Sequence, residues 1–206
     1  MNICLRPSPG TLIGLLNLFI YIDSLCNVTI RLHFMALLCP IDKLKAGHEL
    51  VMCDSEHALT AHKELFRFSD EVYVLAGPQD NMFDSIREMV DAFNAAPSTG
   101  PSRIQIVLGW ENILRVSSWK PERPAAGDVF IVLKNSGLSQ QDLQPFKTAD
   151  IYDLFPWLYY GKRFDVLRKV CHAAKKQLEN HLKNHAIRVD GHLMADDSRR
   201  IVASSL

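Results

Sequence analysis

The chain has 206 residues, of which 48% are hydrophobic, and its 23 basic residues balance its 23 acidic residues. This length fits one domain with a tail, and this composition argues against a disordered chain. A net charge of zero gives no general electrostatic case for nucleic acid or acidic lipid as a partner, although a local basic patch can still bind either.

The five cysteines are scattered along the chain and form no Cys-x-x-Cys pair. Cys53 lies in an apolar run, where a thiol behaves as a small hydrophobic side chain. We therefore expect it to be buried and inert as a nucleophile. The pattern favours a reducing, cytoplasmic compartment over a disulfide scaffold.

Residues 1–40 form an atypical apolar leader, in which one apolar run starts at Leu12 and ends at Ile22. That run is shorter than the roughly 20 apolar residues that span a bilayer, and no small-residue cleavage site follows it. A buried helix or a non-native leader is the preferred interpretation, and membrane association through Leu12 to Ile22 is the alternative. Residues 28–38 alternate between apolar and polar side chains and predict a strand.

The centre of the sequence begins with an apolar run, residues 50–53, that ends on Asp54. A continuous apolar run suits a strand that is covered on both faces of a parallel sheet. Parallel α/β sheets carry their functional groups beyond the carboxyl ends of the strands. Asp54 is therefore the candidate catalytic residue, and its alternative role is that of an ordinary acid that caps the next turn.

Three further segments complete this central unit. Residues 60–68 are expected to be helical, with Leu65 and Phe68 directed inward, and residues 71–76 predict a second strand. Residues 82–93 have apolar side chains at helical spacing, which predicts an amphipathic helix. These side chains are Met82, Phe83, Ile86, Met89, Val90 and Phe93.

The remaining segments continue this alternation, with predicted strands at residues 103–108 and 128–133 and the clearest helix at residues 164–185. The apolar stripe of that helix consists of Leu167, Val170, Cys171, Ala174, Leu178 and Leu182. Residues 188–206 are predicted to be a polar tail. Strands that alternate with helices predict an α/β domain over residues 41–187, with an open, mostly parallel sheet flanked by helices.

The central unit resembles the MinD/ParA family of deviant-Walker P-loop ATPases, including the CpaE/TadZ group that positions pili. The matching segments are Cys53-Asp54-Ser55, the strand Phe68-Ser69-Asp70-Glu71-Val72-Tyr73-Val74, Gly77-Pro78 and Asp84-Ser85-Ile86-Arg87. The similarity covers roughly residues 45–185. It implies that Asp54 lies near the water shell of a Mg²⁺ ion, and that intact relatives form dimers around ATP.

The chain also departs from that family, because it contains no Gly-rich loop with a lysine and a Ser or Thr to hold phosphates and Mg²⁺. Glu56 replaces the proline after the switch acid, and Gly109-Trp110 replaces an Asn-Arg tip. We therefore expect an N-terminally incomplete P-loop-NTPase-like fold without a cofactor. ATP and Mg²⁺ would bind only if an intact phosphate loop existed elsewhere.

The leading hypothesis is a degenerate or truncated MinD/ParA-like protein that acts in partitioning or in positioning a pilus or plasmid. It would work through protein contacts, with a protein partner or as a homodimer. One alternative is an α/β enzyme that uses Asp54 with His57 or His62, and another is a membrane-tethered interaction protein. Basic residues near the last helix make a weak, non-specific DNA contact a further alternative. They are Lys162, Arg163, Arg168, Lys169, Lys175 and Lys176.

Two histidine groups and one aromatic cluster are further candidate sites. Glu56, His57 and His62 lack the spacing of a zinc-binding helix face, so no metal site is expected. His181 and His185 are four residues apart, with His172 nearby, but a solvated helix face is the preferred interpretation. The aromatic cluster at residues 155–160 is expected to belong to the core, with a partner-binding surface as the alternative.

Overall fold

The computed structural model describes residues 49–76, 82–95, 100–146 and 150–206. The expectations for the run from Leu12 to Ile22 and for the strand at residues 28–38 lie outside these residues. In the part of the chain that is described, no helix has both the length and the apolar character needed to cross a membrane. Residues 41–206 belong to one compact unit.

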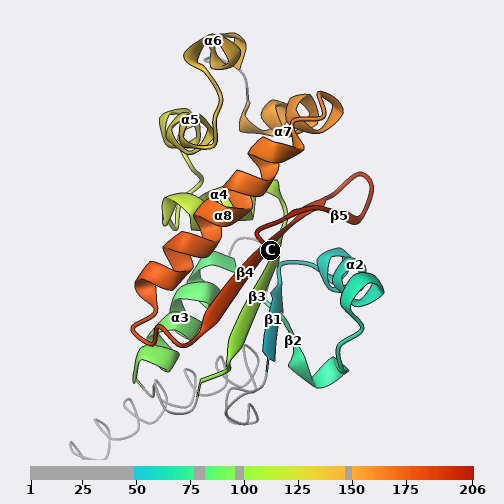
Figure 1. Ribbon diagram of the computed structural model, residues 1–206, viewed down its shortest axis with the longest axis vertical. Helices are drawn as coiled ribbons and strands as arrows, with labels where there is room; N and C mark the ends of the chain where they lie inside the picture. Colours follow the sequence, from blue (N-terminus) through green and yellow to red (C-terminus); the bar gives the residue numbers. More distant parts are fainter. Residues whose placement is uncertain (1–48, 77–81, 96–99, 147–149) are drawn as a thin grey trace, which may run out of the picture. The chain divides into compact units, whose positions relative to one another are not determined.

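Five strands form one sheet in the order β2-β1-β3-β4-β5 (Figure 1). They are β1 (Glu49–Cys53), β2 (Tyr73–Leu75), β3 (Arg103–Leu108), β4 (Arg188–Ala195) and β5 (Arg200–Ser204). β1, β2, β3 and β4 are parallel, and β5 runs antiparallel to β4. The predicted mostly parallel α/β fold is confirmed.

Helices cover both faces of this sheet. They are α2 (Glu56–Phe66), α3 (Met82–Ala95), α4 (Trp110–Ser118), α5 (Ala126–Asn135), α6 (Gln140–Leu143), α7 (Ile151–Tyr160) and α8 (Phe164–His181). Two short 3₁₀ turns, η2 (Asp70–Val72) and η4 (Gln144–Phe146), complete the described elements. α3, α4 and α8 lie on one face and α2 lies on the other (Figure 1).

The predicted apolar stripes of α3 and of the last helix are buried, which confirms both amphipathic patterns. α8 ends at His181, four residues before the predicted end. It packs closely on β4, because a Cβ on Gly191 would lie 3.0 Å from the carbonyl oxygen of Cys171. Glycine at position 191 therefore allows the helix to approach the sheet.

Helix α2 begins earlier than predicted, and this changes which side chains face the core. The backbone of Ser55 is extended, and its hydroxyl accepts a 3.1 Å hydrogen bond from the Ala58 N–H, so Ser55 caps the helix. Ala58 and His62 are then buried, whereas Leu65 is 60% exposed. The prediction that Leu65 faces inward was wrong.

Residues 128–133, predicted as a strand, lie in helix α5. Val129, Val132 and Leu133 are buried at helical spacing, while Ile131 is 60% exposed. The β-branched residues suggested a strand, but packing on neighbouring helices decides the conformation here, and β-propensity is strongly context-dependent.

The predicted polar tail, residues 188–206, was also wrong, because it forms strands β4 and β5. Every residue of β4 after Arg188 is buried, including Asp190 and His192. These two polar side chains have partners on other elements, as described below. The segment therefore belongs to the sheet of the domain.

Candidate functional site

Asp54 follows β1 directly and lies at the carboxyl edge of the sheet. Its Oδ2 accepts a 2.6 Å hydrogen bond from the Gly109 N–H and a 2.9 Å hydrogen bond from the side-chain amide of Asn112. Gly109 is the N-cap residue of α4, and Asn112 lies in the first turn of that helix. The carboxylate therefore caps α4 from a neighbouring strand, where the helix dipole favours an anion.

The environment of Asp54 does not fully satisfy its charge. The residue is only 4% exposed, and Oδ1 has no hydrogen-bond partner among the described residues. Burial raises the pKa of Asp54 above its ordinary value, although the hydrogen bonds from Asn112 and Gly109 oppose this rise. A buried acceptor without a partner is unfavourable. This oxygen is itself buried, so its missing partner is a cost to the fold and does not by itself mark a ligand site.

A second carboxylate, that of Asp196, reaches the same edge from the end of β4. A Cβ on Gly109 would lie 3.5 Å from Oδ2 of Asp54 and 3.6 Å from Oδ1 of Asp196, so both carboxylates approach this position within van der Waals contact. Burial raises the pKa of Asp196, the charge of Asp197 raises it further, and His57 lowers it. The charge of Asp196 in turn raises the pKa of Asp54, and two such acids are candidate ligands for a hard cation.

Asp196 was missed because its segment was interpreted as a tail. One signal in the sequence could have identified it, since an acid follows the run 188–195 just as Asp54 follows the run 50–53. In the described parts of the chain, no group of three or more His, Cys, Asp or Glu side chains could hold a metal ion. Any cation here would therefore depend on amide oxygens and water in addition to the two acids.

The structure does not bring Glu56, His57 and His62 together. Glu56 and His57 are exposed on the first turn of α2, whereas His62 is buried. The ring nitrogens of His62 lie 3.0 Å from the Tyr73 hydroxyl and 3.0 Å from Oε1 of Gln105. Within the described residues, neither histidine has a hydrogen bond to Asp54, so the predicted Asp–His pairing does not form.

The second histidine group and the candidate thiol offer no site either. Because α8 ends at His181, His185 does not share a helical turn with it, and the His181 ring stacks on Trp119 at 3.8 Å. Cys53 is fully buried, as predicted, and burial raises the pKa of its thiol far above the ordinary value. A thiol in that state is a poor nucleophile.

The predicted aromatic cluster lies in α7 and is only partly in the core. Leu158 is fully buried, the Phe155 ring lies 5.6 Å from that of Trp110, and Tyr160 is 70% exposed. The preferred core interpretation therefore fits one side of the helix, and the end at Tyr160 remains open to solvent.

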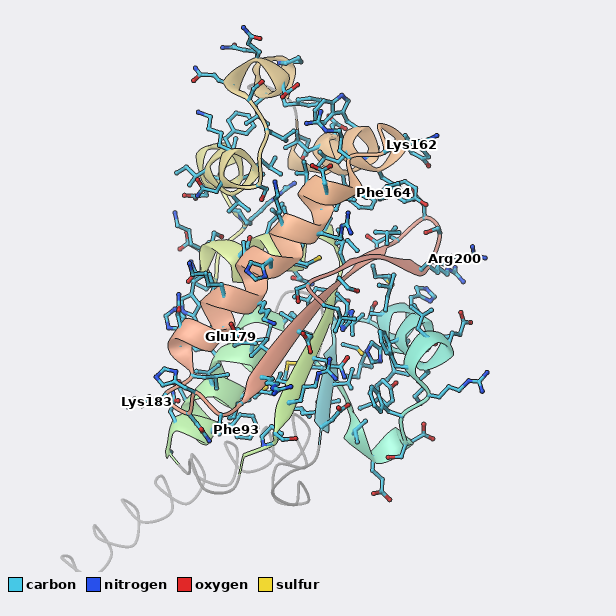
Figure 2. The ribbon with its side chains drawn as sticks, in the orientation of Figure 1. Phe93, Lys162, Phe164, Glu179, Lys183 and Arg200 are labelled. Carbon is cyan, nitrogen blue, oxygen red and sulfur yellow. The ribbon has the colours of Figure 1, made fainter. Side chains whose placement is uncertain are left out.

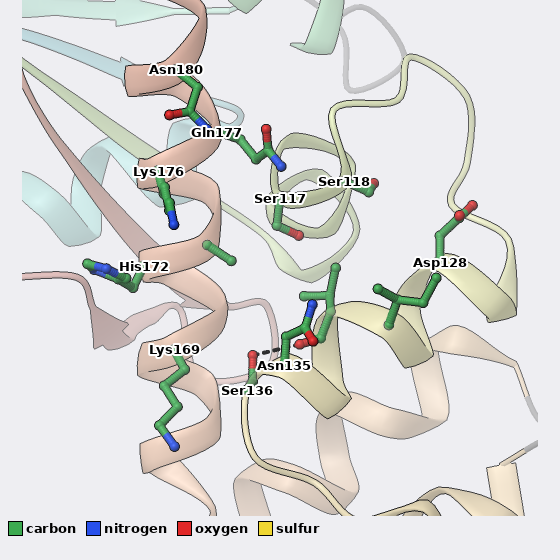
Figure 3. Close-up of a pocket in the computed structure, with 13 residues that line it drawn as sticks. Ser117, Ser118, Asp128, Asn135, Ser136, Lys169, His172, Lys176, Gln177 and Asn180 are labelled. Carbon is green, nitrogen blue, oxygen red and sulfur yellow. Dashed lines mark hydrogen bonds between the residues drawn. The ribbon is translucent and has the colours of Figure 1, made fainter. Parts of the chain in front are cut away.

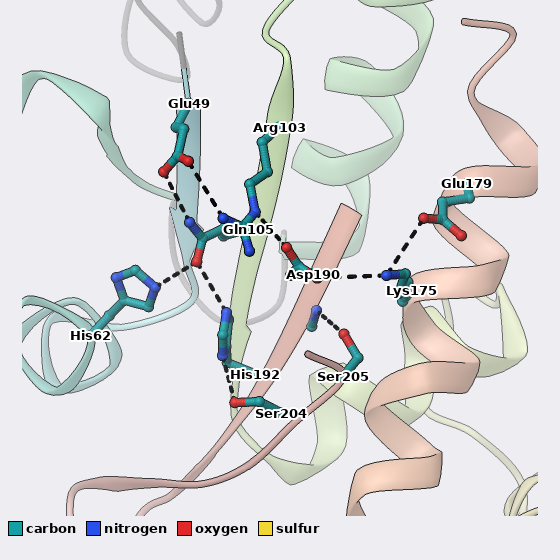
Figure 4. Close-up of polar contacts among 11 residues, drawn as sticks. Glu49, His62, Arg103, Gln105, Lys175, Glu179, Asp190, His192, Ser204 and Ser205 are labelled. Carbon is teal, nitrogen blue, oxygen red and sulfur yellow. Dashed lines mark hydrogen bonds and ion pairs between the residues drawn. The ribbon is translucent and has the colours of Figure 1, made fainter. Parts of the chain in front are cut away.

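A buried polar cluster lies under α2, centred on Gln105 (Figure 4). Oε1 of Gln105 lies 3.0 Å from Nε2 of His62 and 3.1 Å from Nε2 of His192. Because a carbonyl oxygen only accepts, both rings must carry their proton on Nε2. Each Nδ1 can then accept from a hydroxyl, that of Tyr73 at 3.0 Å or that of Ser204 at 2.7 Å.

The burial of this cluster favours the neutral form of both imidazoles. Burial is the main cause that lowers the pKa of both rings, and the pKa of His192 falls to about 4. The amide of Gln105 is held in this orientation because its Nε2 donates to Glu49 at 3.2 Å. The cluster therefore joins α2 to strands β2, β3, β4 and β5 through hydrogen bonds of neutral groups, and Gln105 adds a bond to the carboxylate of Glu49 in β1.

Charged side chains extend the cluster toward α8. Arg103 lies between Glu49, at 3.5 Å, and Asp190, at 2.5 Å. Lys175 of α8 lies 3.6 Å from the other oxygen of Asp190 and 3.9 Å from Glu179. These pairs account for the polar residues of β4, and they stabilise the strands whose carboxyl ends carry Asp54 and Asp196.

Two substitutions at Asp54 separate its charge from its hydrogen bonds. Asn keeps an acceptor for the Gly109 N–H and removes a buried charge, so the free energy of unfolding at pH 7 is expected to stay unchanged or to rise. Ala leaves that N–H and the Asn112 amide without their acceptor. It should lower the free energy of unfolding by about 1–3 kcal/mol. Urea unfolding of both variants measures the difference.

The pH dependence provides a further check. A carboxyl whose pKa is raised by folding destabilises the protein above that pKa, and the penalty disappears as the pH falls toward 3.8. The advantage of Asn over Asp should therefore shrink on acidification. Asp91→Asn, on the exposed side of α3, is the matched control and should change stability by less than about 0.5 kcal/mol. Equal losses for Asn and Ala would mean that the charge itself stabilises α4.

Comparison of the chain with models of protein families, with curated proteins and with solved structures finds no match.

Proposed function

We propose that this chain is a MinD/ParA-like protein that acts through protein contacts in positioning or partitioning, and that it does not hydrolyse nucleotide. Three features support the proposal. The order of β1, α2, β2, α3 and β3 agrees with the resemblance, Asp54 lies at the tip of β1, and the sequence contains no phosphate loop.

The observation that carries the proposal is the use of the Asp54 carboxylate inside the protein. Its Oδ2 accepts hydrogen bonds from Gly109 and Asn112, both at the start of α4. The acid that would face a nucleotide-bound Mg²⁺ ion in an active relative here caps a helix. Its role is then to fix α4 against the sheet, and the surface of the domain is left for partners.

One observation favours a second candidate, an enzyme that depends on a divalent cation. Oδ2 of Asp54 and Oδ1 of Asp196 would lie 3.5 Å and 3.6 Å from a Cβ on Gly109, so the two carboxylates approach the same point of the sheet edge. A cation bound by the two acids would lower the repulsion between them. This candidate does not require a histidine.

Thermal unfolding of the full chain with three additions separates these possibilities: Mg²⁺ alone, ATP alone, and both together. A ligand present at 100 times its Kd stabilises the folded state by about 2.7 kcal/mol, which raises Tm by about 5–10 °C in a chain of this size. The proposal predicts no rise with any addition.

The other outcomes are equally specific. A rise that requires Mg²⁺ and ATP together would show nucleotide binding and overturn the proposal. A rise with Mg²⁺ alone that disappears in Asp196→Asn would favour the cation-dependent enzyme. Asp197→Asn, next to Asp196 and also exposed, is the matched control and should respond to Mg²⁺ as the unmodified chain does.

A further inference from the structure

A groove of about 650 Å³ lies between α4, α5 and α8 (Figure 3). It is lined by Ser117 at the end of α4, by Val132 and Asn135 of α5, and by residues of α8 that include Ala173 and Gln177. Neither Asp54 nor Asp196 belongs to its lining. The groove is thus a second candidate site, separate from the carboxyl edge.

Three side-chain amides line this groove and have no hydrogen-bond partner among the described residues. They are those of Asn135, Gln177 and Asn180, and each can donate and accept. The floor between them includes the apolar side chains of Val132 and Ala173, and Ile131 stands at the edge with 60% of its surface exposed. An extended peptide has backbone N–H and C=O groups and apolar side chains that would match these features.

The groove also has two positive charges that are not compensated. Lys169 and Lys176 are exposed and have no ion pair in the described parts of the chain. The lining acid, Asp128, is neutralised by Lys120 at 2.7 Å. The two lysines are seven residues apart on α8, which places their Cα atoms about 10 Å apart along the helix axis. In an extended segment of the polyproline II type, which has three residues per turn and rises about 3.1 Å per residue, acidic residues three positions apart lie on one side with nearly the same spacing.

We propose that this groove binds an extended, acidic peptide segment of a partner protein. Two acids of the segment pair with Lys169 and Lys176, an apolar side chain between them contacts Val132 and Ala173, and its backbone bonds to the side-chain amides. The inference rests on the proposed function, because it names the kind of partner contact that the protein uses.

Nucleic acid fits this surface less well. The basic residues around α8 do not form one continuous stripe, because Lys175 pairs with Asp190 and Glu179, and the guanidinium of Arg163 lies over the Trp157 ring at 5.9 Å. The apolar floor and the amides would also gain little from a phosphate backbone. The groove therefore matches a peptide with acidic side chains three positions apart and an apolar side chain between them.

Selection of phage-displayed random decapeptides on the full chain tests this proposal. We expect the selected peptides to be rich in Asp and Glu, with acids three positions apart and an apolar residue between them. A synthetic copy of the best binder should bind the double variant Lys169→Gln/Lys176→Gln about tenfold more weakly, since each exposed ion pair contributes up to about 1 kcal/mol. Fluorescence anisotropy measures this change.

The matched control is Lys162→Gln/Lys183→Gln, which removes the same charge from exposed lysines near the two ends of α8 (Figure 2). It should bind the peptide within about twofold of the unmodified chain, and both double variants should keep their stability within about 0.5 kcal/mol. Equal weakening in both variants, or selected peptides without acidic residues, would overturn the proposal.

Two further outcomes keep this inference separate from the proposed function. If a 30-base-pair DNA duplex loses binding in the groove variant and the peptide does not, the surface binds nucleic acid and the inference is wrong. If ATP with Mg²⁺ stabilises the chain while peptide binding still depends on Lys169 and Lys176, the proposed function fails and the groove inference stands.

Discussion

Replacement of Gln105 by leucine is expected to lower the free energy of unfolding by about 2–6 kcal/mol. The side chain keeps nearly the same volume, but the Nε2–H groups of His62 and His192 lose their shared acceptor. Both rings are fully buried, so water cannot replace the missing oxygen. Each buried donor without a partner costs about 1–3 kcal/mol. Urea unfolding at pH 7.5 measures the effect.

Gln141→Leu is the control for this substitution, because it makes the same change on the exposed surface of α6. It should alter stability by less than about 0.5 kcal/mol. Long-range ¹H–¹⁵N NMR of the unmodified chain should find the ring proton on Nε2 in both histidines. A Gln105→Leu protein as stable as the original, with those protons moved to Nδ1, would show that the shared acceptor is not required.

Acidification from pH 6.5 to 4 is expected to remove about 3 kcal/mol of stability through His192. Burial and the neighbouring charges of His62 and Arg103 lower the pKa of His192 to about 4, although Asp190 opposes this. The unfolded chain therefore binds more protons than the folded chain in this range. The stabilising contribution is complete above pH 6.5 and is lost as the pH falls to about 4, at 1.36 kcal/mol for each pKa unit.

Asp54 and Asp196 change the same measurement in the opposite direction, because folding raises the pKa of each carboxyl. The contribution of His192 is therefore obtained as a difference from His192→Gln, which keeps a side-chain amide donor for Gln105 and does not titrate in this range. Between pH 6.5 and 4, the free energy of unfolding of the variant should decline by about 3 kcal/mol less than that of the unmodified chain. Identical declines in the two proteins would show that His192 is not buried in its neutral form.

The buried cluster and the candidate site depend on the same strands. Glu49, Arg103 and Asp190 stabilise β1, β3 and β4 in register, and the opposite ends of β1 and β4 carry Asp54 and Asp196. We therefore expect substitutions that disturb the cluster to disturb the geometry around Gly109 as well. Burial raises the pKa of Asp54, and perturbed carboxyl groups of this kind cluster at functional sites.

The amino-acid sequence alone determined the elements whose signal is local. The helices at residues 82–93 and 164–185 were predicted from apolar side chains that repeat at helical spacing, and the strand at residues 103–108 has the predicted bounds. The position of Asp54 at a strand tip also follows from a short apolar run that ends on an acid. These features depend on residues that are close in sequence, within about one or two turns of a helix.

Only the tertiary structure decided the remaining features. Residues 128–133 are helical because one side of that segment packs on other helices, which a β-branched sequence does not reveal. Strand β4 contains the polar residues Asp190 and His192, and their burial requires Arg103 and Gln105, each 87 residues from its partner in that strand. A polar side chain can be buried only where such a partner is present. Since Asp196 follows β4, its place beside Asp54 depends on that distant pairing.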